Sequence, residues 1–199
     1  MIVGITGRTG SGKTAAAKVF ESYGAYMIDA DKLGHKALLK TGTAYNEVVE
    51  AFGPGILAPD GEIYRKVLGR IVFSDAAKLT LLNRITHKHI ARYIAEEISD
   101  AAFSPIKYKN AVLDAVLLYE SGVYRFCNAV IAVVSGADKR RERIIARDGL
   151  CTEAANRRIS IQEENNIDAS KLADFLLEND GSYEDFIDQT KKLAEALFG

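Results

Sequence analysis

The amino-acid sequence predicts an α/β protein in which a parallel sheet of five strands is flanked by helices. Short apolar segments alternate with stretches of helical periodicity, and unbroken apolar runs are typical of strands buried on both faces of a parallel sheet. The predicted strands are Ile2–Thr6, Ala25–Ile28, Ala111–Glu120, Ala129–Val134 and Ala173–Asn179. Too much helical sequence separates the second strand from the third for one crossover, so we expect an inserted helical subdomain at 32–104.

Composition sets limits on the class of protein. The 199 residues suffice for a single domain with inserts, and their formal net charge of -1 gives no reason to expect a nucleic-acid partner. No apolar stretch is long enough for a membrane span, and the start does not read as a signal peptide. The two cysteines, Cys127 and Cys151, lack metal-ligand spacing, which favours reduced structural thiols and a cytoplasmic location.

The segment from Gly7 to Thr14 carries the most specific motif. It reads G-R-T-G-S-G-K-T, the P-loop pattern, and it stands between a predicted strand and the helix former Ala15–Tyr23. Gly7 and Gly12 are expected to adopt backbone angles forbidden to other residues, so that backbone N–H groups face an anion. Lys13 offers a charge to the β- and γ-phosphates, and the Thr14 hydroxyl is a ligand for Mg²⁺. The predicted ATP-binding residues are Gly10, Ser11, Gly12, Lys13, Thr14 and Ala15.

Two acids follow the second predicted strand. Asp29 and Asp31 stand at its carboxyl end, where ligands bind in open parallel α/β sheets. On an extended chain the two carboxylates point the same way, whereas they diverge if a helix starts at Asp31. Such acids beside a P-loop suit Mg²⁺ or a substrate hydroxyl. The alternative for Asp31 is a helix N-cap, and the two roles are compatible.

Asp114 is the single charged residue of the third predicted strand. It resembles the second acid of P-loop proteins, which holds the water shell of Mg²⁺. A buried carboxylate without compensation is costly, so we expect a partner among Lys13, Thr14 and the metal.

A basic helical stretch after the fourth strand predicts a lid at 139–165. Arg143 and Arg147 are four residues apart and share a helix face, as expected of arginines that close over phosphates. For Lys139 and Arg140 a solvated helix face is the preferred interpretation. His87 and His89 of the insert do not share a helix face, so a metal site there is not expected.

Motifs spread over nearly the whole chain resemble the dephospho-coenzyme A kinase family. Beyond the P-loop, they are I-D-A-D at 28–31, L-N-x-I-T-H at 82–87, L-L-Y-E at 117–120, R-x-x-x-Q at 158–162, and A-D at 173–174 leading to N-D-G at 179–181. The chain departs from the family at Lys88 and Val116, where proline is usual. Both departures bear on fine substrate geometry rather than on the phosphate site.

The resemblance implies an enzyme that phosphorylates the ribose 3′-hydroxyl of dephospho-coenzyme A with ATP and Mg²⁺. Asp31 would be the general base, Lys13 and Arg143 would stabilise the transferring phosphoryl group, and Arg147 would bind ATP. Thr14 and Asp114 would serve the metal. Candidates for the acceptor site are Thr6, Asp29, Arg65 and His87. The partners would be small molecules, and the protein a monomer or a weak homo-oligomer.

Two other classes of protein stay open at this point. Another small-molecule kinase, for nucleoside monophosphates or shikimate, would have an acceptor region shorter than the stretch that ends near Ser104. A nucleotide-binding switch without acceptor chemistry would need a partner surface and a water-positioning residue. The sequence shows no N-K-x-D motif and no obvious apolar partner patch.

Overall fold

The computed structural model describes residues 1–104 and 108–199, and the chain divides into two compact units. The first, here called the P-loop unit, comprises Met1–Asp29 and Asp100–Gly199. The second, the helical unit, comprises Ala30–Ser99. No helix within the described ranges has the length and apolar character needed to span a membrane.

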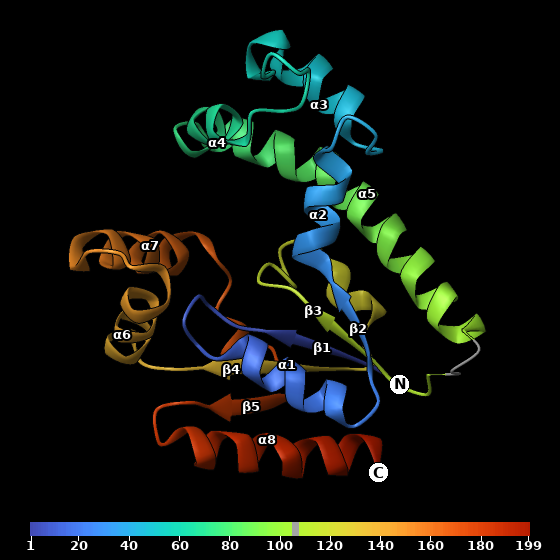
Figure 1. Ribbon diagram of the computed structural model, residues 1–199, viewed down its shortest axis with the longest axis vertical. Helices are drawn as coiled ribbons and strands as arrows, with labels where there is room; N and C mark the ends of the chain where they lie inside the picture. Colours follow the sequence, from blue (N-terminus) through green and yellow to red (C-terminus); the bar gives the residue numbers. More distant parts are fainter. Residues whose placement is uncertain (105–107) are drawn as a thin grey trace. The chain divides into compact units, whose positions relative to one another are not determined.

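The P-loop unit is built on a five-stranded parallel sheet, as predicted (Figure 1). Its strands lie in the order β2-β3-β1-β4-β5, so β1 is central and hydrogen-bonds to β3 and β4. The strands are β1 (Ile2–Thr6), β2 (Tyr26–Asp29), β3 (Ala111–Asp114), β4 (Ala129–Val134) and β5 (Phe175–Glu178). Because all five run parallel, their carboxyl ends share one edge, where ligands bind in such sheets.

The third strand is shorter than predicted. β3 ends at Asp114, and the apolar residues up to Glu120 form turns instead of a strand. The backbone N–H of Ala115 still donates to the Ile5 carbonyl, at 3.1 Å, but the chain then leaves the sheet. Leu118 is nevertheless fully buried. A short apolar run cannot by itself distinguish a buried strand from a buried loop.

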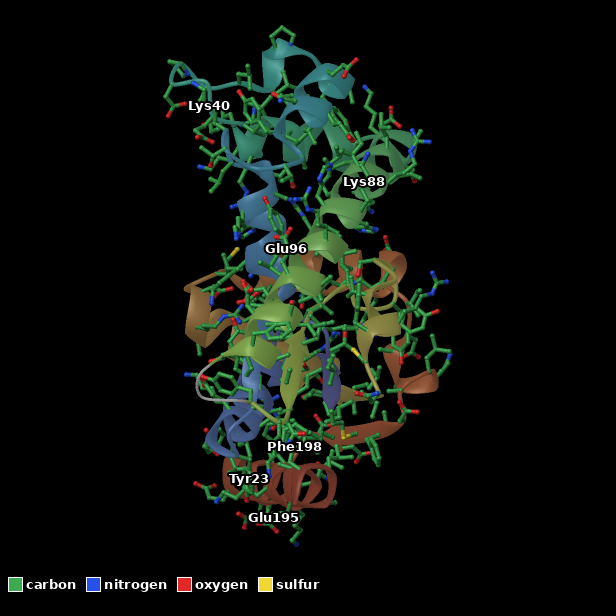
Figure 2. All side chains as sticks on the ribbon, turned by 90° about the vertical axis from the view of Figure 1, so that its right-hand side faces the viewer. Tyr23, Lys40, Lys88, Glu96, Glu195 and Phe198 are labelled. Carbon is green, nitrogen blue, oxygen red and sulfur yellow. The ribbon has the colours of Figure 1, made fainter. Side chains whose placement is uncertain are left out.

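Two helices cover one face of the sheet. α1 (Lys13–Ser22) and α8 (Tyr183–Phe198) lie side by side there, with the rings of Phe20 and Phe198 in edge contact at 5.3 Å (Figure 1). The Tyr23 hydroxyl donates to Glu195, at 2.8 Å (Figure 2). The core between helices and strands is apolar and buried, and it includes Val3, Ile5, Ala16, Phe20, Val112, Ile131, Val133, Leu177 and Phe186.

A helical hairpin follows β4. It consists of α6 (Ala137–Asp148) and α7 (Thr152–Asn165), joined by a turn in which Gly149 has a φ of 64°. Ile144, Ala155 and Ile159 form its small core. Two short 3₁₀ segments, η2 (Val123–Phe126) and η3 (Ala169–Lys171), complete the connections of this unit.

The helical unit contains α2 (Ala30–Leu38), α3 (Tyr45–Phe52), η1 (Pro54–Ile56), α4 (Arg65–Phe73) and most of α5 (Ala76–Phe103). α3 ends before Gly53, which has a φ of 80° and is followed by Pro54. α4 begins at Arg65, although the helical spacing of apolar residues extends back to Ile63. Ile63 forms an antiparallel bridge with Leu57 instead of joining the helix.

Candidate active site

The P-loop connects β1 to α1 through glycines with distinct functions. Gly10 and Gly12 have φ angles of 79° and 105°, a region that L side chains rarely adopt. This confirms the expected need for glycine at Gly12. The same expectation was wrong for Gly7, whose φ angle is not positive. A Cβ atom on Gly7 would instead lie only 2.7 Å from the Val133 carbonyl oxygen. Gly7 is required by close packing against β4 rather than by its backbone angles.

The amino end of α1 is open towards an anion. Gly12 is the N-cap residue, and no side chain caps the helix. The first turn therefore presents backbone N–H groups and the positive end of the helix dipole at the end of the glycine loop. This is the arrangement that binds phosphate groups at helix amino termini.

Lys13 and Asp114 form an ion pair at the carboxyl edge of the sheet. Their side chains are only 12% and 15% exposed, so the pair is largely shielded from solvent. The prediction that Asp114 needs a partner is confirmed, with Lys13 as that partner. Asp29 at the end of β2 is the register partner of Asp114 on β3, so the two strands end in neighbouring acids. One cation and two carboxylates thus stand next to the P-loop.

Arg143 of α6 is fastened to the P-loop and to the end of β5. One terminal nitrogen of its guanidinium donates to the Gly10 carbonyl at 3.2 Å and to Ser135 Oγ at 3.1 Å. The other donates to the Asn179 carbonyl at 2.7 Å and to Asn179 Oδ1 at 3.1 Å. The structure therefore brings Arg143 to the phosphate-binding loop, where its positive charge faces the loop's own carbonyl groups.

Two contacts with the P-loop involve residues that the sequence analysis did not place in the site. The buried amide of Asn179 donates to the Ser11 carbonyl at 2.7 Å, and the Thr9 backbone N–H donates to Gln162 Oε1 of α7 at 2.8 Å. Both residues belong to motifs that carry the family resemblance, R-x-x-x-Q and N-D-G. Their place in those motifs was the only sign in the sequence that the two residues matter. A motif does not show which residues it contacts, and here the contacts link positions more than 150 residues apart.

Arg147 is oriented differently from Arg143. Its guanidinium donates to Asp148 at 2.7 and 3.0 Å, and Arg158 donates to the same carboxylate at 2.5 Å. The hydrogen bonds from Arg147 and then Arg158 hold the pKa of Asp148 at about 2. The Arg147 side chain is 59% exposed. Arg143 and Arg147 share a helix, yet the structure ties Arg143 alone of the two to the P-loop.

The solvated-face interpretation was right for Lys139 and wrong for Arg140. Lys139 is exposed, whereas Arg140 is only 2% exposed and forms an ion pair with Glu163 of α7. The hairpin turns Arg140 inward, because α7 folds back along α6 and covers that position. A single helical sequence cannot reveal which of its charged residues a neighbouring helix will cover.

Thr6 ends β1 next to the P-loop. Its hydroxyl is buried and donates to the carbonyl of Val116, at 3.1 Å. Val116 is one of the two positions where the family usually has proline. Proline retains the carbonyl group and lacks only the N–H, so this contact does not depend on the departure.

The remaining candidates lie in the helical unit, on or beside α2. Asp31 is in the first turn of α2, which begins at Ala30, so the N-cap interpretation was wrong. One turn further along, His35 Nε2 lies 2.7 Å from Arg65 Nη2 at the start of α4. Residues four apart share a helix face, so Arg65 comes to the face of α2 that carries Asp31.

His87 belongs to α5, which packs against α2. The two helices approach each other closely at Gly34 of α2, where an added Cβ would lie only 3.3 Å from the Ile90 side chain of α5. His87 lies one helical turn before Ile90 on α5. His87 is half-buried, and this burial lowers the pKa of its imidazole. Lys88, the second departure from the family, points to α3 and pairs with Glu47 at 2.7 Å (Figure 2). The helical unit thus brings Arg65 and His87 to α2, while Lys88 stabilises a contact between α5 and α3.

The two cysteines are free thiols in different settings. Cys127 is half-buried, and burial raises the pKa of its thiol to about 12. Cys151 is exposed before α7, so the expectation of a structural thiol was wrong at that position. In the described part of the chain, no three His, Cys, Asp or Glu side chains are arranged to hold a metal ion.

The sheet order and the strand, glycine loop and helix at its centre are those of P-loop kinases. Shikimate kinase from Bacteroides thetaiotaomicron has a TM-score of 0.52 with this chain at 14% identity, covering 99% of this chain and 98% of that one. At that identity the likeness shows the fold alone. The fold of this chain is therefore that of a P-loop kinase.

Sequence comparison gives the family within that class. The family model for dephospho-CoA kinase matches residues 1–185. A dephospho-CoA kinase from Aquifex aeolicus is 38% identical over 199 residues, covering 98% of this chain and 96% of that relative. The chain belongs to the dephospho-CoA kinase family.

Two solved structures share the fold over nearly the whole chain. The protein TT1252 from Thermus thermophilus has a TM-score of 0.79 at 30% identity, covering 100% of this chain and 98% of that one. Dephospho-CoA kinase from Campylobacter jejuni has a TM-score of 0.66 at 28% identity, with coverage of 98% and 96%.

Proposed function

We propose that this protein transfers the γ-phosphoryl group of ATP to the ribose 3′-hydroxyl of dephospho-coenzyme A, which yields ADP and coenzyme A. The observation that carries the proposal is the family match over residues 1–185, which includes both the P-loop and the helical unit. The geometry of the P-loop unit supports it independently, because the loop is shaped for phosphate groups without any ligand. Cytoplasmic location is part of the proposal, since ATP is supplied there.

The donor half of the reaction belongs to the P-loop unit. Backbone N–H groups of residues 10–15 would hold the phosphates of ATP, and the Lys13 ammonium would neutralise charge on the γ-phosphoryl group. Lys13 is already held in place by Asp114. Arg143 would approach the same oxygens from α6, exchanging its contact with the Gly10 carbonyl for one with phosphate. Charges fixed in this way stabilise a transition state without further reorganisation.

The donor set at the P-loop fits Mg²⁺. Thr14 is exposed in the first turn of α1, and Asp114 and Asp29 end neighbouring strands. Hydroxyl and carboxylate oxygens are ligands that Mg²⁺ accepts, and in kinases it completes its shell with water and phosphate oxygens. We assign Thr14 as a direct ligand and Asp114 to the metal's water shell. Bound Mg²⁺ would neutralise charge on the β- and γ-phosphates.

The acceptor half needs a group that takes a proton. The ribose 3′-oxygen attacks the γ-phosphorus, the bond from that phosphorus to the β–γ bridging oxygen breaks, and ADP leaves. The 3′-hydroxyl proton passes to the Asp31 carboxylate, which also orients the hydroxyl before transfer. Asp31 follows β2 by two residues, at the start of the helical unit. Asp29 is the alternative acid for this step.

We assign supporting roles to the remaining candidates. Arg65 and His87 would contact the acceptor from the helical unit, whose residues 32–104 we propose as the acceptor-binding insert. Thr6 and Asp29 of the P-loop unit are also assigned to acceptor binding. The region 139–165 would act as a lid, with Arg147 free to exchange Asp148 for a phosphate of ATP once the lid closes.

A panel of acceptors tests the proposal. ADP release from Mg-ATP is measured with dephospho-coenzyme A, AMP, shikimate, gluconate or no acceptor. We expect turnover with dephospho-coenzyme A at least a hundred times the rate with water, following the size of kinase acceleration. The product is then analysed for phosphate on the 3′-oxygen. Faster turnover with another acceptor, or equal ADP release with water, would contradict the proposal.

A further inference from the structure

Two adjoining cavities lie along β4 in the P-loop unit. The P-loop cavity has a volume of about 240 Å³, and its lining includes Thr6, Arg8, Ser11, Ala132, Arg140 and Glu163. The tyrosine cavity has a volume of about 470 Å³, and its lining includes Tyr119, Tyr124, Cys127, Val130 and Asp174. Ile167 lines both cavities, so the two are neighbours at that residue. Together they suit an extended molecule better than a compact one.

The P-loop cavity contains buried polar groups that lack partners. Arg140 donates through one terminal nitrogen to Glu163, but its Nε and its other terminal nitrogen have no hydrogen-bond partner among the described residues. Ser11 is 1% exposed, and its hydroxyl likewise has no partner there. Buried donors are almost always hydrogen-bonded in native proteins, so these groups are satisfied by an acceptor in the cavity, either water or a polar atom of a ligand.

The charges around this cavity balance, which restricts the class of ligand. Its described lining carries four charged side chains, two positive and two negative. Glu163 pairs with Arg140 and lies 4.0 Å from Arg8, and Asp168 accepts from the backbone and hydroxyl of Ser170. A cavity with no net charge does not favour a phosphate dianion. It suits a neutral group with carbonyl oxygens that accept hydrogen bonds from Arg140.

The walls next to these polar groups are apolar or aromatic. Alternate residues of a strand point to opposite faces, so Ala132 lies on the face of β4 opposite the core residues Ile131 and Val133. Its small side chain leaves space for the cavity there. Leu172 and the tilted ring pair Tyr119–Tyr124, 5.2 Å apart, line the second cavity. A ligand that alternates aliphatic segments with amide-like carbonyls would match these walls and the unpaired donors.

We infer that these two cavities bind the pantetheine arm of the acceptor, a neutral chain with two amide groups and aliphatic segments. The inference rests on the proposed function. Thr6 and Arg8 belong to or adjoin the P-loop, so the cavity begins beside the loop that holds the γ-phosphoryl group. Arg140 donates to an amide carbonyl of the arm, and the end that bears the thiol lies between Tyr119 and Cys127.

Kinetic constants for both substrates test the inference in the full-length protein. Arg140→Met removes the unpaired donors and keeps most of the side-chain volume, and Ala169→Leu narrows the P-loop cavity from η3. We expect each to raise the KM for dephospho-coenzyme A by about tenfold, the effect of one lost hydrogen bond to a charged group. The KM for ATP and kcat should change less than twofold in Ala169→Leu, which lies outside the proposed lid, and should change less than the KM for dephospho-coenzyme A in Arg140→Met. The control is Lys191→Met, because Lys191 is an exposed residue of α8 that pairs with Asp188 and does not line either cavity.

Each result decides between alternatives. An unchanged KM for dephospho-coenzyme A in the folded variants, or an equal rise in the KM for ATP, would overturn the inference. If Arg140→Met does not fold, Ala169→Leu decides alone. Absence of any turnover of dephospho-coenzyme A by the wild type would instead refute the proposed reaction, and the inference with it.

Discussion

The P-loop unit and the helical unit hold their candidate site residues in different ways. In the P-loop unit the backbone forms the binding surface, and the buried Asn179 and the partly buried Arg143 fasten it through carbonyl groups. In the helical unit the candidates are side chains on helix faces, and the Arg65–His35 contact at 2.7 Å is exposed. The nucleotide end is thus formed before the ligand arrives, while the acceptor end depends on side chains that can reorient.

This difference has a physical reason. Phosphate groups are the same in every reaction of this class, so a fixed array of backbone donors suits them and needs no rearrangement. An acceptor hydroxyl must be brought to within about 3 Å of phosphorus, and small adjustments of side chains decide whether it is. Substitutions should therefore separate the two units by which kinetic constant they change.

Asp31→Asn should have the largest effect. Asparagine keeps the shape of the side chain but cannot accept the proton, so kcat should fall by about a thousandfold. The Kd for ATP should be nearly unchanged, because Asp31 belongs to the helical unit. Single-turnover kinetics and calorimetry measure the two quantities. Asp29→Asn is the control: an inactive Asp29→Asn beside an active Asp31→Asn would reverse the roles, and full activity of both would refute the paired-acid argument.

Lys13→Ala comes next and probes the opposite unit. Loss of the ammonium should lower kcat by about a hundredfold to a thousandfold, since its charge stabilises the transferring phosphoryl group. Steady-state turnover is measured beside circular dichroism, which should show an intact fold. Lys18→Ala, an exposed lysine of the same helix, is the matched control and should behave as wild type. Wild-type turnover by folded Lys13→Ala would rule out the P-loop mechanism.

Arg143→Ala should have a smaller effect with a distinct signature. We expect kcat to fall about tenfold to a hundredfold, while the KM for ATP changes little, because the arginine acts on charge that develops during transfer. Arg147→Ala, which removes the exposed partner of Asp148, should change kcat less. Equal effects on kcat and on ATP affinity would mean that Arg143 acts only by supporting the loop through Gly10 and Asn179.

Lowering the pH should destabilise the two units in different pH ranges. This is the smallest effect among the four predictions. Burial lowers the pKa of His87 below the usual 6.5, so the unfolded chain binds more protons, and stability falls as the pH drops below about 6.5. The pKa of Asp148 is also lowered, from 3.8 to about 2, so its contribution is present above 3.8 and is lost between 3.8 and 2. The melting temperature is followed from pH 8 to pH 3.

Two variants assign the two ranges. His87→Gln should flatten the pH dependence of the melting temperature between pH 7 and pH 5. Asp148→Asn should lose the stability that the carboxylate gives above pH 3.8, and its difference from wild type should shrink as the pH falls from 3.8 towards 2. A wild-type melting temperature that is constant from pH 7 to pH 5 would contradict the assignment to His87.

The parallel sheet, the P-loop and the family could all be predicted from the amino-acid sequence. Buried parallel strands such as β4 require continuous apolar runs, and their ends were predicted at Ala129 and Val134 because polar residues flank them. The P-loop was equally clear, since Gly12, Lys13 and Thr14 act through backbone freedom and local chemistry. Properties that depend on neighbours in sequence can be predicted from sequence.

Which residues become buried, and which distant residues contact each other, depends on the tertiary structure. Arg140 became buried because α7 folds over it, β3 stopped at Asp114 because the chain leaves the sheet there, and Gly7 is required because β4 passes close to it. Gln162 and Asn179 reach the P-loop across more than 150 residues of sequence. Each of these outcomes depends on packing between distant segments, and hydrophobic periodicity carries no information about which segments will meet.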